Sequence, residues 1–77
     1  MPKERSERII PVAPLDRLIR KAKVERVSEK AANSLGKILE EIGLEIAKRA
    51  GELAIHANRK TVTGRDIDLA FNQWKRD

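Results

Sequence analysis

Residues 28–57, SEKAANSLGKILEEIGLEIAKRAGELAIHA, decide the fold of this chain because they form one long amphipathic segment. Apolar residues recur along the segment at helical spacing, and no proline interrupts it. Ser28 is a favourable N-cap, and Asn58 can adopt the left-handed conformation that ends a helix. The pattern predicts a single helix of 30 residues, about 45 Å long at the usual rise per residue. The apolar stripe comprises Leu35, Ile38, Leu39, Ile42, Ile46, Ala50, Leu53, Ala54 and Ala57.

Shorter helices flank this segment on both sides. Residues 15–22 carry apolar side chains at helical spacing, and Pro14 can take the first helical position, where its missing N–H costs nothing. Thr63 and Asp66 fit a capping box at the start of a third helix. That helix places Ile67, Ala70, Phe71 and Trp74 on one face. The glycines inside the long segment suggest close approach of another backbone near its middle.

Two short straps join the helices, an extended one at Lys23–Val27 and another at Arg59–Val62. The expected fold class is therefore all-α, with helices in the order short, long, short. Residues 1–10 are polar and aperiodic, which predicts a flexible N-terminal arm. Residues 11–77 form the folded domain.

The length of the central helix predicts a dimer. A compact chain of 77 residues has a diameter of roughly 30 Å, which is shorter than the helix itself. Two short flanking helices cannot cover so long an apolar stripe. A second copy or a similar partner must bury the remainder, and little folded monomer is expected.

Composition excludes several functional classes. The chain has 17 Lys and Arg against 12 Asp and Glu, a formal net charge of +5, and it has no cysteine. Disulfide frameworks and cysteine-based metal or redox sites are therefore excluded, and the lone His56 cannot hold a metal by itself. No nucleophile–base pair is available, so we expect neither an enzyme nor a cofactor. Without a membrane span or signal peptide, we expect a cytoplasmic protein with no membrane partner.

The positive charge is unevenly distributed along the chain. Residues 1–30 carry a net charge of +4 and residues 58–64 a net charge of +2. Residues 31–57 carry −1, and residues 65–77 are neutral. Both basic segments include a strap, and this segregation favours a polyanionic partner such as nucleic acid.

Five segments, spread over residues 9–77, together resemble the archaeal histones. The resemblance implies a histone fold and a handshake dimer, in which the long helices cross and each first strap pairs with the partner's second strap. It also implies wrapping and compaction of double-stranded DNA, and hence a chromosome-associated protein of the nucleoid. The matching segments are PVAP at 11–14, ERVS at 25–28, KILEEIG at 37–43, HANRKTV at 56–62 and DIDLA at 66–70.

With the straps paired in this way, the basic segments form one candidate DNA surface. The resemblance assigns Arg26 to minor-groove insertion and places Arg17 and Arg20 against the groove or backbone. Backbone N–H groups at the starts of the second and third helices can hold phosphate, aided by the helix dipoles. The candidate DNA-binding residues are Arg17, Arg20, Lys23, Arg26, Val27, Ser28, Lys60, Thr61, Val62 and Thr63.

The resemblance implies a second interface, between dimers. In the family, positions matching Leu53, His56, Asp66 and Leu69 join dimers through a four-helix bundle, with His56 bonded to Asp66 of the next dimer. Asp66 would also pair with Arg59 of its own chain. Such a self-complementary patch lets dimers chain along DNA into open-ended assemblies.

Each assignment has a simpler alternative. The strap and first-helix arginines could be solvated, Arg59 could contact DNA directly, and Leu53 could be ordinary core with His56 at the surface. Lys23 departs from the family, which usually has glycine there. A lysine at that point could hinder tight stacking of superhelical turns or could grip DNA of the adjacent turn.

Two alternative functions use the same features. One is a histone-fold transcription-factor subunit that requires a different partner chain. Separately, a packaging histone could form a heterodimer with a related histone. The other is a helix-turn-helix regulator, against which the length of the middle helix argues. No ordered array of Asn, Gln and Arg occupies a groove-entering helix, so base readout is not expected and DNA deformability should set any preference.

Overall fold

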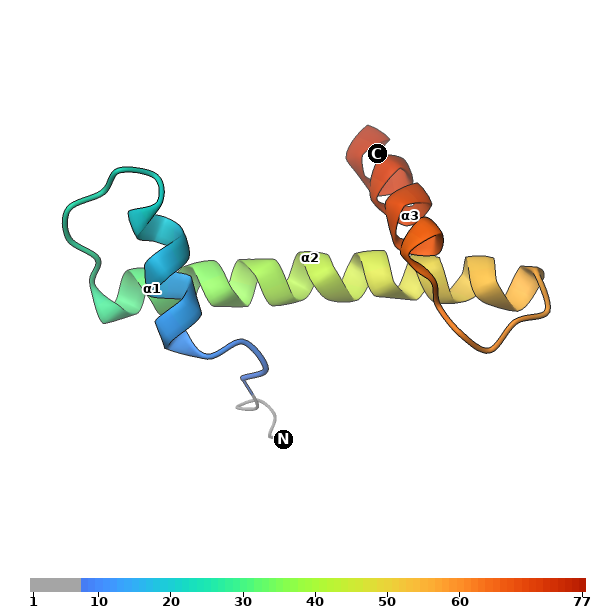
Figure 1. Ribbon diagram of the computed structural model, residues 1–77, viewed down its shortest axis with the longest axis horizontal. Helices are drawn as coiled ribbons and strands as arrows, with labels where there is room; N and C mark the ends of the chain where they lie inside the picture. The colour runs from blue at the N-terminus through green and yellow to red at the C-terminus, as the bar shows by residue number, and fades with distance from the viewer. Residues whose placement is uncertain (1–7) are drawn as a thin grey trace. The chain divides into compact units, whose positions relative to one another are not determined.

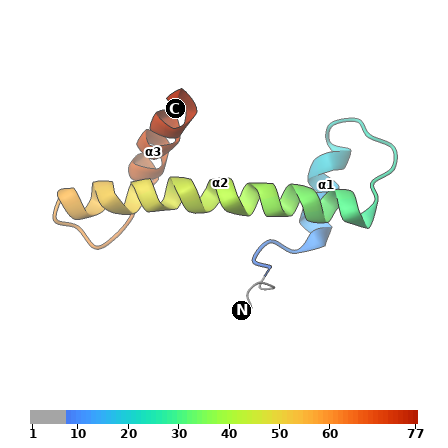
Figure 2. The ribbon, with the colours of Figure 1, turned by 180° about the vertical axis from the view of Figure 1, so that it is seen from behind.

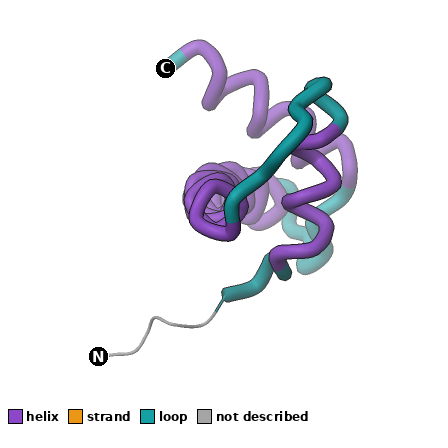
Figure 3. The backbone as a smooth tube through the Cα atoms, turned by 90° about the vertical axis from the view of Figure 1, so that its left-hand side faces the viewer, coloured by secondary structure: helices purple, strands orange, loops and turns teal. Residues whose placement is uncertain are grey.

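The computed structural model describes residues 8–77, and residues 1–7 lie outside its described part. Within residues 8–77 it contains three helices and no strand: α1 (Val12–Arg20), α2 (Glu29–His56) and α3 (Gly64–Arg76) (Figure 1). The all-α class and the order short, long, short predicted from the sequence are therefore confirmed. The two straps are loops without regular secondary structure (Figure 3).

The chain divides into two compact units, Met1–Glu40 and Glu41–Asp77. In the first unit, α1 crosses the beginning of α2, and the first strap arches between them (Figures 1 and 2). Leu15 of α1 is buried over Gly36, where an added Cβ would come within 2.6 Å of the leucine Cδ1. The close approach expected of a helix glycine therefore occurs at this position and lets α1 pack on α2.

The expected close approach near the middle of α2 is not found within residues 8–77. A Cβ added at Gly43 or at Gly51 would meet nothing within 4 Å. Both positions have room for a partner and cost helix stability in the isolated chain, because glycine is a poor helix former.

The bounds predicted for the first helix were wrong by two to three residues at each end. Pro11, at φ −67° and ψ 163°, is the N-cap, and Pro14 lies inside the first turn. An N–H is dispensable throughout that turn because it has no intrahelical acceptor. The helix ends at Arg20 because the chain then turns, with Lys23 at a φ of 71°. The first strap thus begins in the left-handed region and not in an extended conformation.

Residues 8–10, which we assigned to a flexible arm, are bonded to α2 in this structure. The backbone N–H groups of Ile9 and Ile10 donate to Glu40 Oε2 at 2.9 and 2.8 Å. Arg8 donates to Asn33 Oδ1 at 2.7 Å. The remainder of the predicted arm, residues 1–7, lies outside the described residues, so the arm and its boundary stay a prediction.

In the second unit, α3 packs on the last part of α2. Ala50, Ala54 and Ala70 are buried between them. The predicted capping box is confirmed, since Thr63 Oγ1 accepts from the Asp66 N–H and the Asp66 carboxylate accepts from the Thr63 N–H. The small alanine side chains allow the two helices to approach closely.

The end of α2 also follows its sequence signal. Asn58 has a φ of 59°, and its N–H donates to the Ile55 carbonyl at 2.9 Å. The N–H of Arg59 reaches back to the Ala54 carbonyl at 2.9 Å. This pair of bonds is a Schellman motif, which satisfies carbonyls that would otherwise lack a partner at the helix end.

Much of the apolar surface expected in the core is exposed in the single chain. Leu15 is the only large apolar side chain that is fully buried among residues 8–77. Ile38, on the predicted stripe, is 52% exposed, and Phe71 of α3 is 40% exposed. The other exposed large apolar residues are Ile9, Leu18, Val24, Leu44, Ile55, Val62, Ile67 and Leu69. This surface agrees with the argument that a partner chain completes the core.

Candidate nucleic-acid interface

The first strap is closed by Arg20, the last residue of α1. Its guanidinium Nε lies 2.5 Å from Asp16 Oδ1, one turn earlier, and its Nη1 donates to the Glu25 carbonyl at 3.1 Å. The carbonyl of Arg20 accepts the Lys23 N–H at 3.0 Å. One residue therefore holds the strap at two points.

The remaining cations of this part of the chain are exposed. Arg17, Lys23 and Arg26 have no salt bridge within residues 8–77. Arg20 differs, because Asp16 already neutralises its charge within the chain. Of the four cations around the first strap that are expected to contact DNA, three thus have no salt bridge within residues 8–77, and Arg20 has one.

The start of α2 matches its predicted N-cap. Ser28 Oγ accepts from the Ala31 N–H at 3.0 Å, and Glu29 follows in the first turn. The Ser28 hydroxyl proton stays available to donate to a phosphate, because the cap uses only an oxygen lone pair. Val27 is half-buried, so it contributes packing beside the exposed cations.

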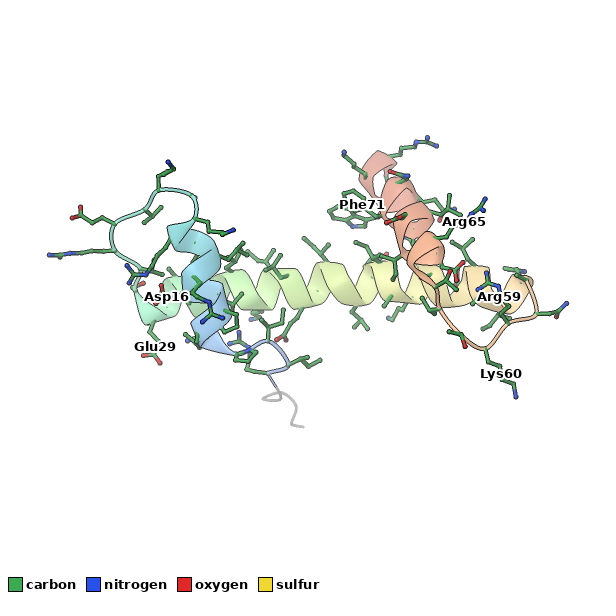
Figure 4. The ribbon with its side chains drawn as sticks, in the orientation of Figure 1. Asp16, Glu29, Arg59, Lys60, Arg65 and Phe71 are labelled. Atoms are coloured by element: carbon green, nitrogen blue, oxygen red, sulfur yellow. The ribbon has the colours of Figure 1, made fainter. Side chains whose placement is uncertain are left out.

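The second strap is held by an ion pair within the chain. Arg59 donates from Nη1 to Asp66 Oδ2 at 2.9 Å and from Nη2 to Asp66 Oδ1 at 3.0 Å. The same Nη1 also donates to the Thr61 carbonyl at 3.1 Å. The structure therefore brings together the two residues expected to pair, and in Figure 4 Arg59 lies beside the start of α3.

Asp66 is a buried carboxylate with several donors. The hydrogen bonds from Arg59, followed by the Thr63 N–H, hold the pKa of Asp66 far below its usual value. The Asp66 carboxylate in turn raises the pKa of the Arg59 guanidinium. Both pKa shifts favour the charged forms, so the ion pair braces the second strap against the start of α3.

Lys60 extends away from the second strap (Figure 4), and it forms no salt bridge within residues 8–77. Thr61, Val62 and Thr63 are also exposed. The N–H of Thr63, which we expected to hold phosphate, instead donates to Asp66 Oδ2. The anion at the start of α3 is thus the chain's own carboxylate, while the Thr63 hydroxyl proton is not used by the cap and can still donate.

Of the residues expected between dimers, His56 and Leu69 are exposed and Leu53 is half-buried. Asp66 is 3% exposed and fills two of the three roles considered for it, the helix cap and the partner of Arg59. Three donors occupy the carboxylate, which has about four acceptor sites. A bond from His56 of another dimer would have to use the site that remains on Oδ1.

Besides the bonds made by Arg20, the sequence reasoning missed two contacts that fix the helices. Glu40 accepts two backbone N–H groups, and the bond from Ile10 is the largest cause of its lowered pKa. Arg49 pairs with Asp77 and lies 3.7 Å from Glu45, and the bond to Asp77 raises its pKa. Only the i, i+4 spacing of Glu45 and Arg49 gave a signal in the sequence.

The described residues hold no group of three or more side chains able to bind a metal. Within residues 8–77, no helix is long and apolar enough to cross a membrane.

Comparison with known proteins agrees with this architecture. Residues 8–71 match the family described as "Histone-like transcription factor (CBF/NF-Y) and archaeal histone". The chain is 57% identical over 61 residues to one of the subunits of the archaeal histone HAN1 of Thermococcus zilligii, and the match covers 79% of this chain and 91% of that protein. It is 49% identical over 62 residues to "Probable archaeal histone 3" of Methanocaldococcus jannaschii, covering 80% and 92% respectively.

The chain therefore belongs to the family of archaeal histones and histone-like transcription factors. The resemblance stated from the sequence and the histone fold it implied are confirmed. Membership makes this a DNA-binding, histone-fold packaging protein and not an enzyme, and it implies histone dimerisation.

Proposed function

We propose that this protein binds double-stranded DNA without sequence specificity, as a homodimer that wraps and compacts the duplex. The observation that carries the proposal is the set of strap cations, Lys23, Arg26 and Lys60, which are exposed and have no salt bridge within residues 8–77. Duplex DNA presents about one phosphate charge per 1.7 Å, and cations that neutralise phosphates release counterions. Binding therefore draws on charge and not on base identity.

The exposed apolar residues support the handshake dimer. In the single chain Leu18, Ile38, Ile67 and Phe71 keep between 38% and 52% of their surface exposed. Burial of apolar area is the main driving force for association. A second copy that crosses α2 would cover such residues and would also pair each first strap with a second strap. The dimer is thus what turns separate basic straps into one DNA surface.

Further assembly of dimers is the second part of the proposal. The exposure of His56 and Leu69, together with the half-buried state of Leu53, supports a contact between dimers through these residues and Asp66. Repetition of such a contact builds an open chain of dimers on DNA. We expect the protein to be associated with the chromosome.

The alternative is a histone-fold protein that needs a different partner, either in a transcription factor or in a heterodimer with a related histone. Two observations favour this alternative. The family includes histone-like transcription factors, and the name of the Thermococcus relative marks that protein as one of several subunits. Sedimentation of the purified chain discriminates between the two. A folded dimer supports the homodimer, whereas an unfolded or monomeric chain supports the need for another partner.

The DNA-binding experiment measures affinity for duplexes of unrelated sequence at several salt concentrations. We expect equal affinities and a log affinity that falls by about 0.9 per phosphate contact for each tenfold rise in salt. Lys60→Ala should weaken binding to all sequences and make the salt slope shallower by about 0.9 for each strap that contacts phosphate. Lys48→Ala is the matched control, because Lys48 is an exposed cation of α2 away from the straps. Equal effects of the two substitutions would contradict the assignment of Lys60.

Nuclease digestion of saturated complexes tests assembly along DNA. Protected lengths that rise in equal steps, one step for each added dimer, support chaining. Leu69→Glu, on the exposed side of α3, should reduce the ladder to its shortest fragment while the dimer persists. A single protected length for the unmodified protein would contradict multimer formation.

A further inference from the structure

Arg20 is the one cation of the first strap region whose charge is already used within the described part of the chain. Its guanidinium is clamped between Asp16 Oδ1 at 2.5 Å and the Glu25 carbonyl at 3.1 Å. Asp16 lies on α1 (Figure 4), one helical turn before Arg20, so the regular geometry of α1 fixes one side of the clamp. The other side reaches out of the helix to the strap.

The carbonyl that Arg20 holds belongs to the peptide bond between Glu25 and Arg26. Because that peptide is planar, fixing its oxygen also fixes the direction in which the Arg26 backbone leaves it. Arg26 is exposed and has no salt bridge within the described residues. The bond from Arg20 therefore acts on the residue assigned to the DNA minor groove.

The second hold on the strap is the bond from the Lys23 N–H to the Arg20 carbonyl at 3.0 Å. Lys23 has a φ of 71°, an unfavourable conformation for a residue with a Cβ. Such a conformation persists where the surroundings impose it. Closure of the strap by both the side chain and the carbonyl of Arg20 supplies that constraint and leaves Lys23 exposed to solvent.

We infer that Arg20 is a positioning residue, braced by Asp16, which orders the first strap so that Lys23 and Arg26 are presented to DNA. The inference rests on the proposed function, and it reverses the role that the sequence suggested for Arg20. A guanidinium fits this task better than an ammonium because its planar fork can donate in two fixed directions at once.

The direction in which DNA affinity changes when an anion is removed distinguishes a positioning role of Arg20 from a purely electrostatic one. Asp16→Ala removes an anion near a DNA-binding surface, which by charge alone should strengthen binding. The positioning role gives the opposite result, a loss of affinity of about two- to fivefold, the range expected when an exposed ion pair is lost. Glu25→Ala is the matched control, because it removes the same charge from the strap but leaves the carbonyl that Arg20 holds. It should bind DNA as tightly as the unmodified chain or more tightly.

Two further measurements complete the test. Arg20→Lys, which keeps the charge, should weaken binding as Asp16→Ala does, with an unchanged salt slope. Amide hydrogen exchange without DNA should be faster across residues 21–27 in both variants, while the protection of α2 shows that the fold is intact. Tighter binding by Asp16→Ala, full affinity of Arg20→Lys, or unchanged exchange in the strap would each overturn the inference. Failure of the proposed function is distinguishable, since it would appear as salt-independent binding by the unmodified chain while the exchange experiment still reports on the strap.

Discussion

Replacing Lys23 by glycine should raise the stability of the protein and weaken its DNA binding. Its φ of 71° places a side chain with a Cβ in the left-handed region, which costs roughly 1–2 kcal/mol. Glycine avoids this cost but loses about 0.5–1 kcal/mol more backbone entropy on folding. Lys23→Gly should therefore stabilise each chain by about 0.5–1 kcal/mol, the difference between these opposing terms. For a domain of this size that corresponds to a rise of about 3–6 °C in Tm.

The assay is thermal denaturation at fixed chain concentration, because the Tm of a dimer depends on concentration. Asn58→Gly is the matched control. Asn58 has a similar φ of 59°, but asparagine tolerates this region, so its gain should be less than half as large. The same Lys23→Gly protein should bind DNA more weakly, with a salt slope shallower by about 0.9 for each strap that contacts phosphate. A lower Tm for Lys23→Gly would refute the strain argument, and an unchanged salt slope would refute the contact with DNA.

Three further predictions concern stability. Thr63→Ala removes a capping hydroxyl and should cost about 1 kcal/mol in chemical denaturation, with Thr63→Ser restoring most of it. Gly36→Ala should cost about 1–3 kcal/mol, since its Cβ would lie 2.6 Å from Leu15 Cδ1, whereas a neutral effect would show that α1 shifts freely. The lowered pKa of Asp66 means that its contribution is complete above about pH 4 and disappears as pH falls further, so Tm should be level from about pH 7 to 5 and drop below about pH 4. An equally steep drop in Asp66→Asn would contradict this.

The local rules of helix structure made most of the fold predictable. Ser28 and Thr63 indicated the starts of α2 and α3, and Asn58 indicated the end of α2, because each signal depends only on a few neighbouring residues. The start of α1 was misplaced because proline is tolerated anywhere in the first turn of a helix. Pro14 therefore indicated the first turn but not the residue at which the helix begins.

The candidate site was less predictable because its geometry depends on contacts across the chain. The sequence showed that the straps are basic, but it did not show that Asp16 and the Glu25 carbonyl occupy Arg20. Every residue has a backbone carbonyl, so the sequence does not show which carbonyl accepts a hydrogen bond. The bonds from residues 9 and 10 to Glu40 were missed for the same reason, because their donors are backbone groups.

In the proposed function, one partner chain would both cover the exposed apolar residues and bring the basic straps together. Phe71 stacks against Trp74 at 6.0 Å, and Lys75 lies 5.5 Å from the Phe71 ring, yet Phe71 remains 40% exposed. A face ordered within its own helix but open to water loses little conformational entropy when a partner covers it. In the proposed function the straps pair only with that same partner, so we expect dimerisation and assembly of the DNA surface to be one event. DNA that binds the dimer must then stabilise it by mass action. Substitutions in the apolar face of α3 should consequently weaken DNA binding most at low protein concentration, where the dimer is the scarce species.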